Sequence, residues 1–439
     1  MKIAVFHNLP SGGGKRALYS FVKYLKNAGH QIDVHVPSTA NENFLPLKDT
    51  VDGFYIYPVP PTMRDAIPPY FQYILPRSYV HLKRERERIT GEINDLNRAQ
   101  ERIADEINAG PYDVVFSEQD QTTMTPFLLR RIKKPAVYYC QQPCRVEEAV
   151  LQEVVRAAFP MPPVPGPVPA YKRIWRAYLR SLEISFPKID KENASHAKYI
   201  LANSYFSTET ILRAYGLNSF VSYLGIDTDL FRPLSLPKEN FVLSVGECRP
   251  HKGFDFTIRS LSLIDEQRRP KMVIVANSTD PRWEDHLVGI AAALRVDLEV
   301  KKAIPDNELV SLYNRARLFV YASILEPFGL APVEAMACGT PVVAVKEGGV
   351  RESVLHNETG ILTPRDECAF AEATAGLFEN DERRERMGRR GAEVVRSFWT
   401  LRHAGERLEA HLKKAVARSK QDSGGCDGFH DKRVGPPTT

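Results

Sequence analysis

Short apolar runs alternate with amphipathic segments along most of the chain. The first half contains the runs KIAVFH (2–7), IDVHV (32–36), DVVFS (113–117) and AVYYC (136–140), and the second half contains FVLSVG (241–246), MVIVA (272–276), LEVKKA (298–303), LFVYA (318–322) and PVVAV (341–345). Segments between these runs, such as residues 17–29 and 254–264, place apolar residues at helical spacing. The alternation predicts an α/β fold of two Rossmann-like, doubly wound domains with parallel sheets.

Two insertions interrupt the pattern of the first half. Residues 77–107 are dense in charge, but isoleucines and a leucine recur at helical spacing, which predicts one long amphipathic helix (Ile89, Ile93, Leu96, Ile103 and Ile107). A proline-rich stretch, 159–171, precedes a basic-aromatic helix (Lys172, Arg173, Trp175, Arg176, Tyr178 and Arg180). This helix face is either simply solvated or contacts anionic lipid headgroups or an acceptor.

These patterns divide the chain into four regions. We expect an N-terminal Rossmann-like domain with the two insertions in residues 1–225, and a second domain in residues 226–398. Residues 399–418 read as a long terminal helix, and residues 419–439 have no periodicity and are expected to be disordered.

Composition narrows the class of protein. The chain has 439 residues, of which 43% are hydrophobic and 26% charged, which is typical of globular proteins. The net charge of +5 is too small to indicate nucleic acid, but it suits an anionic ligand or membrane surface where positive residues cluster. The six cysteines are scattered, which argues against a zinc site or a disulfide framework and favours reduced thiols in the cytoplasm.

Neither a membrane span nor a secretory signal is expected. No apolar run reaches the roughly 18 residues that a span needs, and MKIAVFHNLP is too short an apolar stretch for a signal peptide. We therefore expect a cytoplasmic protein, with peripheral binding to the inner face of the membrane as a candidate association. No metal-ligand pattern is evident, and neither a metal nor a cofactor is expected.

A glycine cluster, PSGGGKRA (10–17), follows the first strand. Gly12, Gly14 and Ala17 match the loose dinucleotide pattern G-x-G-x-x-A, but the second strand ends at Val36-Pro37, without the acidic residue that would hold a ribose. A Walker A loop is excluded because Arg16 follows Lys15. Two interpretations stay open: amides that approach an anion at a helix N-terminus, or a plain tight turn.

Two loops of the second half carry charged groups where strands end. SVGECRPHKGFDF (244–256) places Arg249 and Lys252 after a strand, where cations suit a phosphate or diphosphate, although a basic loop alone is more often only solvated. In SILEPFGLAPVEAMACGTP (323–341), Glu326 lies in the loop after a strand and Glu334 about one turn into the following helix. Free amides at that helix start can hold an anion, and two carboxylates can bind hydroxyl groups. The alternative is a helix cap plus a surface glutamate.

The motif E-P-F-G-L-A-P-V-E resembles the E-x-F-G-x-x-x-x-E signature of the retaining glycosyltransferases of family 4. The segments LANSYFSTETI, GIDTDLFRP, P-H-K-G, EAMACGTPVVAVKEGGVRE and NETGIL are similar to that family as well. The resemblance is strong over residues 197–400 and looser before them. It implies a GT-B fold, whose two Rossmann-like domains face a central cleft, with the terminal helix crossing back to the N-terminal domain.

The resemblance also implies site roles. Lys252 would contact the donor diphosphate, and Glu334 would hydrogen-bond the ribose. Glu326 would hold the donor sugar and phosphates together with the amides of three residues (Phe328, Gly329 and Leu330). Gly13 and Gly14 would approach the donor from the N-terminal domain. Arg249 would replace an arginine that the family often carries where this chain has Glu247.

The first half departs from the family pattern. Glu118, with Asp120 nearby, stands where many members have a histidine, and Gln141 and Gln142 replace a His-Glu pair. We therefore take Glu326, Glu118 and Asp120 as the candidate catalytic residues.

The expected activity is hexosyltransferase-like transfer, with retention, from a nucleotide diphosphate sugar to a carbohydrate or lipid-linked acceptor. An epimerase or phosphorylase would not be expected to carry the glutamate pair, and a dehydrogenase would need the missing ribose acid. A catalytically weak or inactive nucleotide-sugar-binding scaffold is the alternative that stays open.

Overall fold

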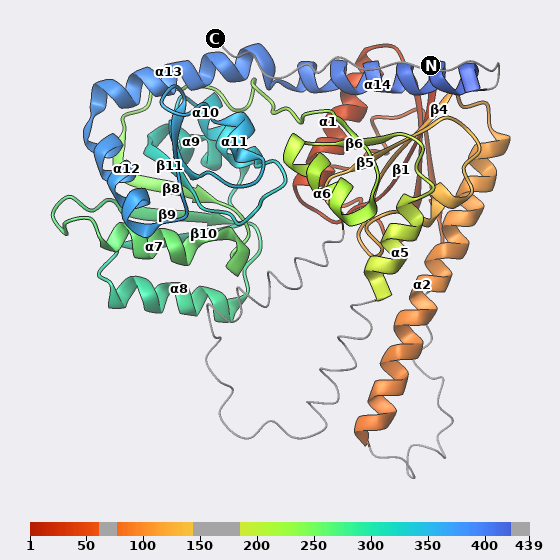
Figure 1. The fold of residues 1–439 in the computed structure, drawn as a ribbon, viewed down its shortest axis with the longest axis horizontal. Coiled ribbons are helices and arrows are strands. Elements are labelled where there is room, and N and C mark those ends of the chain that lie inside the picture. The colour runs from red at the N-terminus through yellow and green to blue at the C-terminus, as the bar shows by residue number, and fades with distance from the viewer. Residues whose placement is uncertain (61–76, 144–184, 423–439) are drawn as a thin grey trace. The chain divides into compact units, whose positions relative to one another are not determined.

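The computed structural model describes residues 1–60, 77–143 and 185–422 (Figure 1). Its contacts divide the chain into two compact units. Among the described residues, the first unit comprises Met1–Ala202, Thr208–Val221 and the chain from Gly405 to Asp422, and the second comprises Asn203–Ser207 and Ser222–Ala404. The proline-rich stretch and the basic-aromatic helix that the sequence predicts, within residues 159–180, lie outside the described residues, as does most of the predicted tail.

The first unit is built on a seven-stranded sheet in the order β3-β2-β1-β4-β5-β6-β7, and every pair of neighbours is parallel. The strands are β1 (Lys2–Asn8), β2 (Gln31–Pro37), β3 (Gly53–Tyr57), β4 (Val114–Asp120), β5 (Ala136–Cys140), β6 (Ile200–Ala202) and β7 (Phe220–Val221). The order reverses between β1 and β4, so the sheet is doubly wound as predicted.

Helices cover this sheet because each has one apolar face. The helices are α1 (Gly13–Asn27), α2 (Arg77–Ala109), α5 (Ser185–Ala194), α6 (Tyr205–Tyr215) and α14 (Leu401–Asp422), with a 3-10 turn η2 (Phe127–Arg130). The predicted amphipathic helix is α2: Ile103 and Ile107 are buried in a cluster with Phe6 and Val115. In Figure 1 its N-terminal part extends past the sheet. Phe21 of α1 packs against the ring of Phe116, with ring centroids 6.2 Å apart.

The predicted terminal helix is α14, and beyond Gly405 it packs on the first unit. Gly405 lies directly against the ring of Tyr24, and Glu409 lies 3.0 Å from Nε2 of His30. The Tyr199 hydroxyl lies 2.8 Å from Nδ1 of His411.

The second unit contains a six-stranded parallel sheet in the order β10-β9-β8-β11-β12-β13. Its strands are β8 (Glu239–Val245), β9 (Lys271–Ala276), β10 (Leu298–Lys302), β11 (Ala316–Tyr321), β12 (Val342–Val345) and β13 (Gly360–Thr363). Its helices are α7 (Phe254–Ser262), α8 (Pro281–Ala293), α9 (Asp306–Arg315), α10 (Leu330–Ala337), α11 (Val350–Ser353), α12 (Glu367–Glu379) and α13 (Asp381–Phe398), with a 3-10 turn η3 (Pro250–Lys252).

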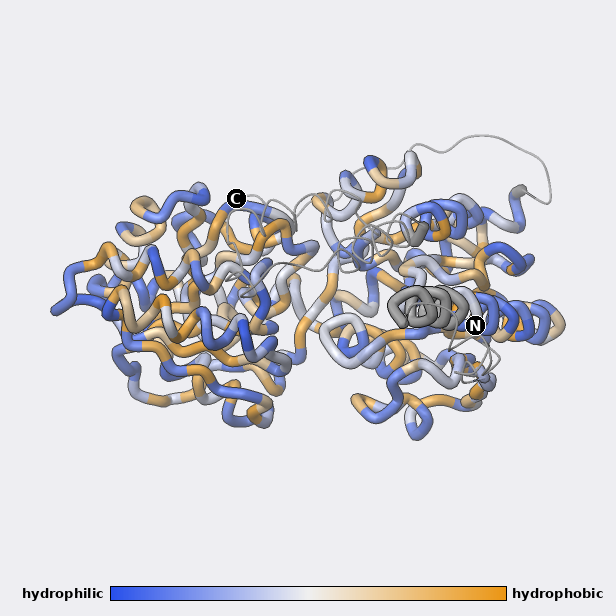
Figure 2. Tube along the Cα trace, turned by 90° about the horizontal axis from the view of Figure 1, so that it is seen from below, coloured by the Kyte–Doolittle hydropathy of each residue, from blue (hydrophilic) through white to orange (hydrophobic). Residues whose placement is uncertain are grey.

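Both units bury most of their inner strands, whereas the outer strands β3 and β10 are partly exposed. Of the residues in β1, β2, β4, β5 and β9, only those at the first position of a strand lie outside the buried class. Figure 2 shows stretches of hydrophobic residues through the interior of each unit, with hydrophilic residues on the outer helix faces and loops. The continuous apolar runs of the sequence are thus explained by parallel strands that are covered on both sides.

The strand order of each sheet identifies one candidate position for ligand binding. In doubly wound sheets, ligands bind outside the carboxyl ends of the two strands between which the order reverses. These strands are β1 and β4 in the first unit and β8 and β11 in the second. The residues that follow these four strands are therefore the first place to look for a site.

Candidate functional site

In the second unit, the loops after β8 and β11 bring together a lysine and a glutamate. Nζ of Lys252, in η3, donates a hydrogen bond of 2.6 Å to Oε2 of Glu326, in the loop after β11. The two side chains are 15% and 24% exposed, so both are sheltered yet reachable from solvent. The sequence reasoning selected both residues, and the structure places them in direct contact.

Close backbone packing holds these two loops in place. Gly253 has a φ of 68°, and a Cβ there would lie 2.2 Å from the carbonyl oxygen of Ala322. The amide of Ile324 donates to the carbonyl of His251 at 2.8 Å. Only a glycine fits at position 253, because its conformation and its contact with the neighbouring strand end both exclude a side chain.

The glycine-rich turn after β12 packs on the backbone of the Glu326 loop. A Cβ on Gly348 would lie 2.3 Å from the carbonyl oxygen of Glu326, and one on Gly349 would lie 2.3 Å from that of Pro327. The amide of Gly349 also donates to the carbonyl of Glu326 at 2.8 Å. These contacts fix the backbone that carries the Glu326 carboxylate.

Helix α10 begins at Leu330 with Gly329 as its N-cap, so Glu334 lies about one turn into the helix, as the sequence predicts. Glu334 is 8% exposed, and its Oε2 accepts a hydrogen bond of 2.8 Å from the Tyr313 hydroxyl. Tyr313 therefore orients the carboxylate, which the sequence reasoning did not foresee. The side chain of Phe328 is buried near the ring of Trp399, with centroids 5.5 Å apart, so only its backbone is a candidate for ligand contact.

Arg365 is a residue of this region that the sequence reasoning missed. It follows β13 and donates from Nε and an Nη to the two carboxylate oxygens of Glu347, at 2.9 and 2.8 Å. The same Nη lies 3.1 Å from the carbonyl oxygen of Ala322. Arg365 thus ties the ends of β11, β12 and β13 together. The only sequence signal was an arginine three positions after the short apolar run that ends at Leu362.

Arg249 forms its ion pair with a different carboxylate from that of its neighbour Lys252. Its side chain is 52% exposed and pairs with Glu247, with Nε 3.3 Å from Oε2. The prediction that Arg249 replaces a donor-binding arginine is left as a prediction, since its described ion pair is with Glu247 and not with Glu326.

The corresponding place in the first unit is buried. Asp120, at the end of β4, is 1% exposed and accepts four hydrogen bonds: from the side chains of Asn8 and Gln100, both at 2.8 Å, and from the amides of Thr122 and Thr123, at 2.7 and 3.0 Å. Both carboxylate oxygens are thereby engaged within the protein, an arrangement typical of a structural carboxylate.

Glu118 lies within β4 and is fully buried. Its carboxyl group lies 3.2 and 3.4 Å from Nε2 of Gln141 and 3.4 Å from the amide of Gln119. Burial raises the pKa of Glu118 to about 8, so the group is mostly protonated at neutral pH. It is thus a neutral acid, whose proton is available for a hydrogen bond.

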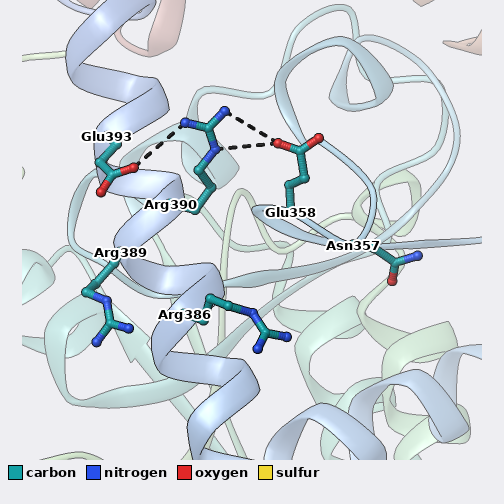
Figure 3. Close-up of a pocket in the computed structure, with 6 residues that line it drawn as sticks. All are labelled: Asn357, Glu358, Arg386, Arg389, Arg390 and Glu393. Atoms are coloured by element: carbon teal, nitrogen blue, oxygen red, sulfur yellow. Dashed lines mark hydrogen bonds and ion pairs between the residues drawn. The ribbon is translucent and has the colours of Figure 1, made fainter. Parts of the chain in front are cut away.

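A pocket of about 360 Å³ lies elsewhere on the second unit, between α13 and the turn before β13 (Figure 3). Its lining is charged (Asn357, Glu358, Arg386, Arg389, Arg390 and Glu393). Arg390 pairs with Glu358 and Glu393, as the dashed lines in Figure 3 show. None of the predicted site residues lines this pocket, which borders the amino end of β13 rather than a carboxyl end.

Two other kinds of feature are absent from the described residues. No group of three or more His, Cys, Asp or Glu side chains in the described part of the chain is arranged to hold a metal ion. Among the helices that the structure describes, none combines the length and the hydrophobicity that a bilayer crossing requires.

Residues 226–394 match the family model of "Glycosyl transferases group 1". They include the Lys252–Glu326 contact, α10 and Arg365, so the predicted class of enzyme, a glycosyltransferase, is confirmed at the level of this domain.

Relatives with known names agree on this class. The D-inositol 3-phosphate glycosyltransferase of Corynebacterium glutamicum (strain R) is 32% identical over 219 residues, which cover 45% of this chain and 52% of that protein. The putative glycosyltransferase YtcC of Bacillus subtilis (strain 168) is 24% identical over 71% of this chain and 86% of its own length. The chain spans about half the length of the first of these relatives.

Solved structures resemble the whole fold. Sucrose-phosphate synthase from Thermosynechococcus elongatus superposes with a TM-score of 0.68 and 17% identity, over 95% of this chain and 99% of that one. Anabaena Alr3699/HepE, solved in complex with UDP and glucose, has a TM-score of 0.63 and 18% identity, over 94% of this chain and 100% of that one. This likeness concerns the fold alone, and it confirms the predicted GT-B class.

Proposed function

We propose that this protein is a retaining glycosyltransferase that moves a sugar from a nucleotide diphosphate sugar to a carbohydrate or lipid-linked acceptor. The observation that carries the proposal is the contact between Lys252 and Glu326 at the place where the strand order of the second sheet reverses. That place is where doubly wound sheets bind ligands, and it lies within the residues that match the family model.

Each group has a chemical task in this proposal. Donor binding would move the Lys252 ammonium from Glu326 to the diphosphate, where it stabilises the negative charge of the leaving group together with the first-turn amides of α10. Glu326, released from Lys252, would accept hydrogen bonds from the sugar hydroxyl groups. Glu334, oriented by Tyr313, would accept them from the ribose.

Retention would follow from attack on the face of the sugar that the diphosphate leaves. The acceptor hydroxyl forms a bond to the anomeric carbon while the bond from that carbon to the diphosphate oxygen breaks, and the departing phosphate accepts the proton. This proposal uses no covalent intermediate. It also matches the resemblance to family 4, whose signature surrounds Glu326 and Glu334.

The comparisons suggest where to look for the substrates. HepE was solved with UDP and glucose, and two of the similar proteins bear names that contain a phosphorylated sugar or polyol. We therefore propose UDP-sugars as the first donors to test and phosphorylated carbohydrates among the acceptors. A cytoplasmic location and binding to the inner face of the membrane are further proposals, and the membrane proposal rests on residues 172–180, outside the described part of the chain.

A thermal-shift panel of UDP, GDP, ADP and their sugars tests donor binding. A ligand at 100 times its Kd stabilises the folded state by about 2.7 kcal/mol, so the right nucleotide should stand out. With that donor, the wild type should release nucleotide diphosphate and the Glu326→Ala variant should release at least about 100-fold less. Glu299→Ala, which breaks a Lys–Glu pair with Lys271 on the same sheet, is the matched control and should keep full activity.

The results separate the alternatives. NMR of the product shows the anomeric configuration, and inversion would contradict the proposed retention. The burial of Glu118 favours one second candidate, a nucleotide-sugar-binding scaffold with little or no catalysis. Binding of a nucleotide sugar without turnover by the wild type, with any acceptor of the panel, would support that scaffold.

A further inference from the structure

The glycine-rich loop of the first unit is followed by a lysine that is buried with its charge. Lys15 lies in the first turn of α1, and its side chain has no exposed surface. Its Nζ contacts Oε1 of Glu42 and lies 3.2 Å from Nε2 of His7. Glu42, in the loop after β2, is 20% exposed.

His7 completes a three-residue cluster and is neutral. Its Nδ1 accepts a hydrogen bond of 3.3 Å from the amide of Leu9, which leaves the ring proton on Nε2. Nε2 lies 3.0 Å from Oε1 of Glu42, so His7 and Lys15 both donate to the same carboxylate. Burial lowers the pKa of His7 to about 4, so the cluster holds one positive charge and one negative charge at neutral pH.

The segment around Glu42 is tied to β1 and α1 at several points. The amide of Leu47 donates to Oε2 of Glu42 at 2.9 Å. The amide of Asn41 donates to the carbonyl of Leu9 at 3.0 Å, just before the glycine-rich loop. The Arg16 guanidinium lies 5.8 Å from the ring centroid of Phe44. The loop of residues 39–47 is thus fastened to both ends of the glycine-rich loop.

A buried cation at this position is unfavourable without Glu42. The N-terminal end of a helix carries partial positive charge, which repels the Lys15 ammonium, and burial of the ammonium adds a desolvation cost. Loss of the carboxylate charge would force Lys15 either to lose its proton or to leave its buried place. Since Lys15 directly follows Gly14, its departure would displace the glycine-rich loop.

We propose that Glu42 is a positioning residue: by holding the Lys15 ammonium against His7, it fixes the glycine-rich loop in the conformation that binds the donor. The part that concerns donor binding rests on the proposed function and on the expectation, implied by the family resemblance, that Gly13 and Gly14 approach the donor. The mechanical part, that Glu42 fixes the loop, rests only on the contacts within the first unit.

The test compares Glu42→Gln with Glu409→Gln. Glu409 is a matched control, because it is 17% exposed and also contacts a histidine and a lysine, His30 at 3.0 Å and Lys413 at 2.6 Å, but it lies on α14. Amide hydrogen exchange of residues 9–16, measured without any ligand, should be at least about 10-fold faster in Glu42→Gln and unchanged in Glu409→Gln. For transfer, Glu42→Gln should raise the donor KM about 10-fold or more, with kcat and the acceptor KM changed much less.

A second variant distinguishes the effect of the uncompensated Lys15 charge from a failure of the protein to fold. Lys15→Met combined with Glu42→Gln removes both charges, so the double variant should recover slow exchange and a donor KM within about 3-fold of the wild type. This double variant also serves if Glu42→Gln alone fails to fold: a double variant that folds with fast exchange in residues 9–16 contradicts the proposal.

The exchange measurement and the transfer kinetics test different parts of the proposal and can fail independently. If the wild type transfers no sugar, the proposed function fails, while the exchange experiment still decides whether Glu42 fixes the loop. Unchanged exchange in Glu42→Gln overturns the inference as a whole. Faster exchange with an unchanged donor KM overturns the role in donor binding.

Discussion

The two units use the same strand arrangement but treat the charges at their reversal points differently. In the second unit, Lys252 and Glu326 lie in loops beyond the strand ends and are partly exposed. In the first unit, Glu118 and Asp120 lie within β4 and are almost completely buried. Topology therefore determines where a site can form, but the distance of a side chain past the strand end determines whether a ligand can reach it.

The sequence spacing explains this difference. β11 ends at Tyr321, five positions before Glu326, so the carboxylate stands clear of the sheet. β4 continues to Asp120, so its two carboxylates lie within the sheet and are buried. We expect the second unit to respond to mutation mainly in activity and the first unit mainly in stability, and three predictions test this contrast.

The largest effect is expected from Lys252→Ala. Loss of the ammonium removes a charge that stabilises the departing diphosphate, so kcat/KM should fall about 10²- to 10³-fold, equivalent to about 3–4 kcal/mol. Stability should change little, because the lysine is partly exposed. Steady-state kinetics and urea denaturation measure the two quantities. Lys271→Ala, which breaks the pair with Glu299 at 2.8 Å, is the control and should change neither strongly, whereas equal activity of both variants would contradict the site.

The next effect is the pH dependence of stability that Glu118 causes. Its folded-state pKa of about 8 exceeds its ordinary value of 4.5, so the folded protein keeps a proton that the unfolded chain loses. The contribution of Glu118 to the free energy of unfolding is therefore fully present below pH 4.5 and is lost as the pH rises to about 8. Relative to wild type, Glu118→Gln should gain up to about 1.4 kcal/mol per pH unit between pH 5 and 8.

Urea denaturation at several pH values measures this gain. Glu101→Gln, which removes a half-buried partner of Arg131 from α2, should show no such pH-dependent gain. Parallel pH profiles of Glu118→Gln and wild type would show that the Glu118 carboxyl ionises normally in the folded protein.

The smallest effect is expected from Asp120→Asn. Asparagine has one acceptor oxygen in place of two, so part of the four-donor set loses its partner and stability should fall by about 2 kcal/mol. The kcat/KM of the variant, measured well below its melting temperature, should stay within about 3-fold of wild type. A collapse of activity with unchanged stability would instead support the catalytic role that the sequence suggested for Asp120.

The sequence by itself determined the class of fold and most of the second unit. Short apolar runs such as 241–246 and 318–322 became β8 and β11, and the place of Glu334 about one turn into a helix was predicted from the motif. These signals are local, since a buried parallel strand needs a continuous apolar run and a helix start needs particular residues. Four strands were not predicted (β3, β6, β7 and β13). Of these, β6 and β7 have only three and two residues, which is too short to show a period.

Only the tertiary structure decided which charged groups meet. Lys15 served in the sequence only to exclude a Walker A loop, but its partner Glu42 lies 27 positions away. Arg365 reaches Glu347, and Tyr313 reaches Glu334, across turns whose course no local pattern reveals. The environment of Glu118, whose burial raises its pKa, likewise includes Gln141, which lies 23 positions further along the chain. Such contacts depend on how whole elements pack, because burial and charge pairing are properties of three-dimensional neighbours rather than of sequence neighbours.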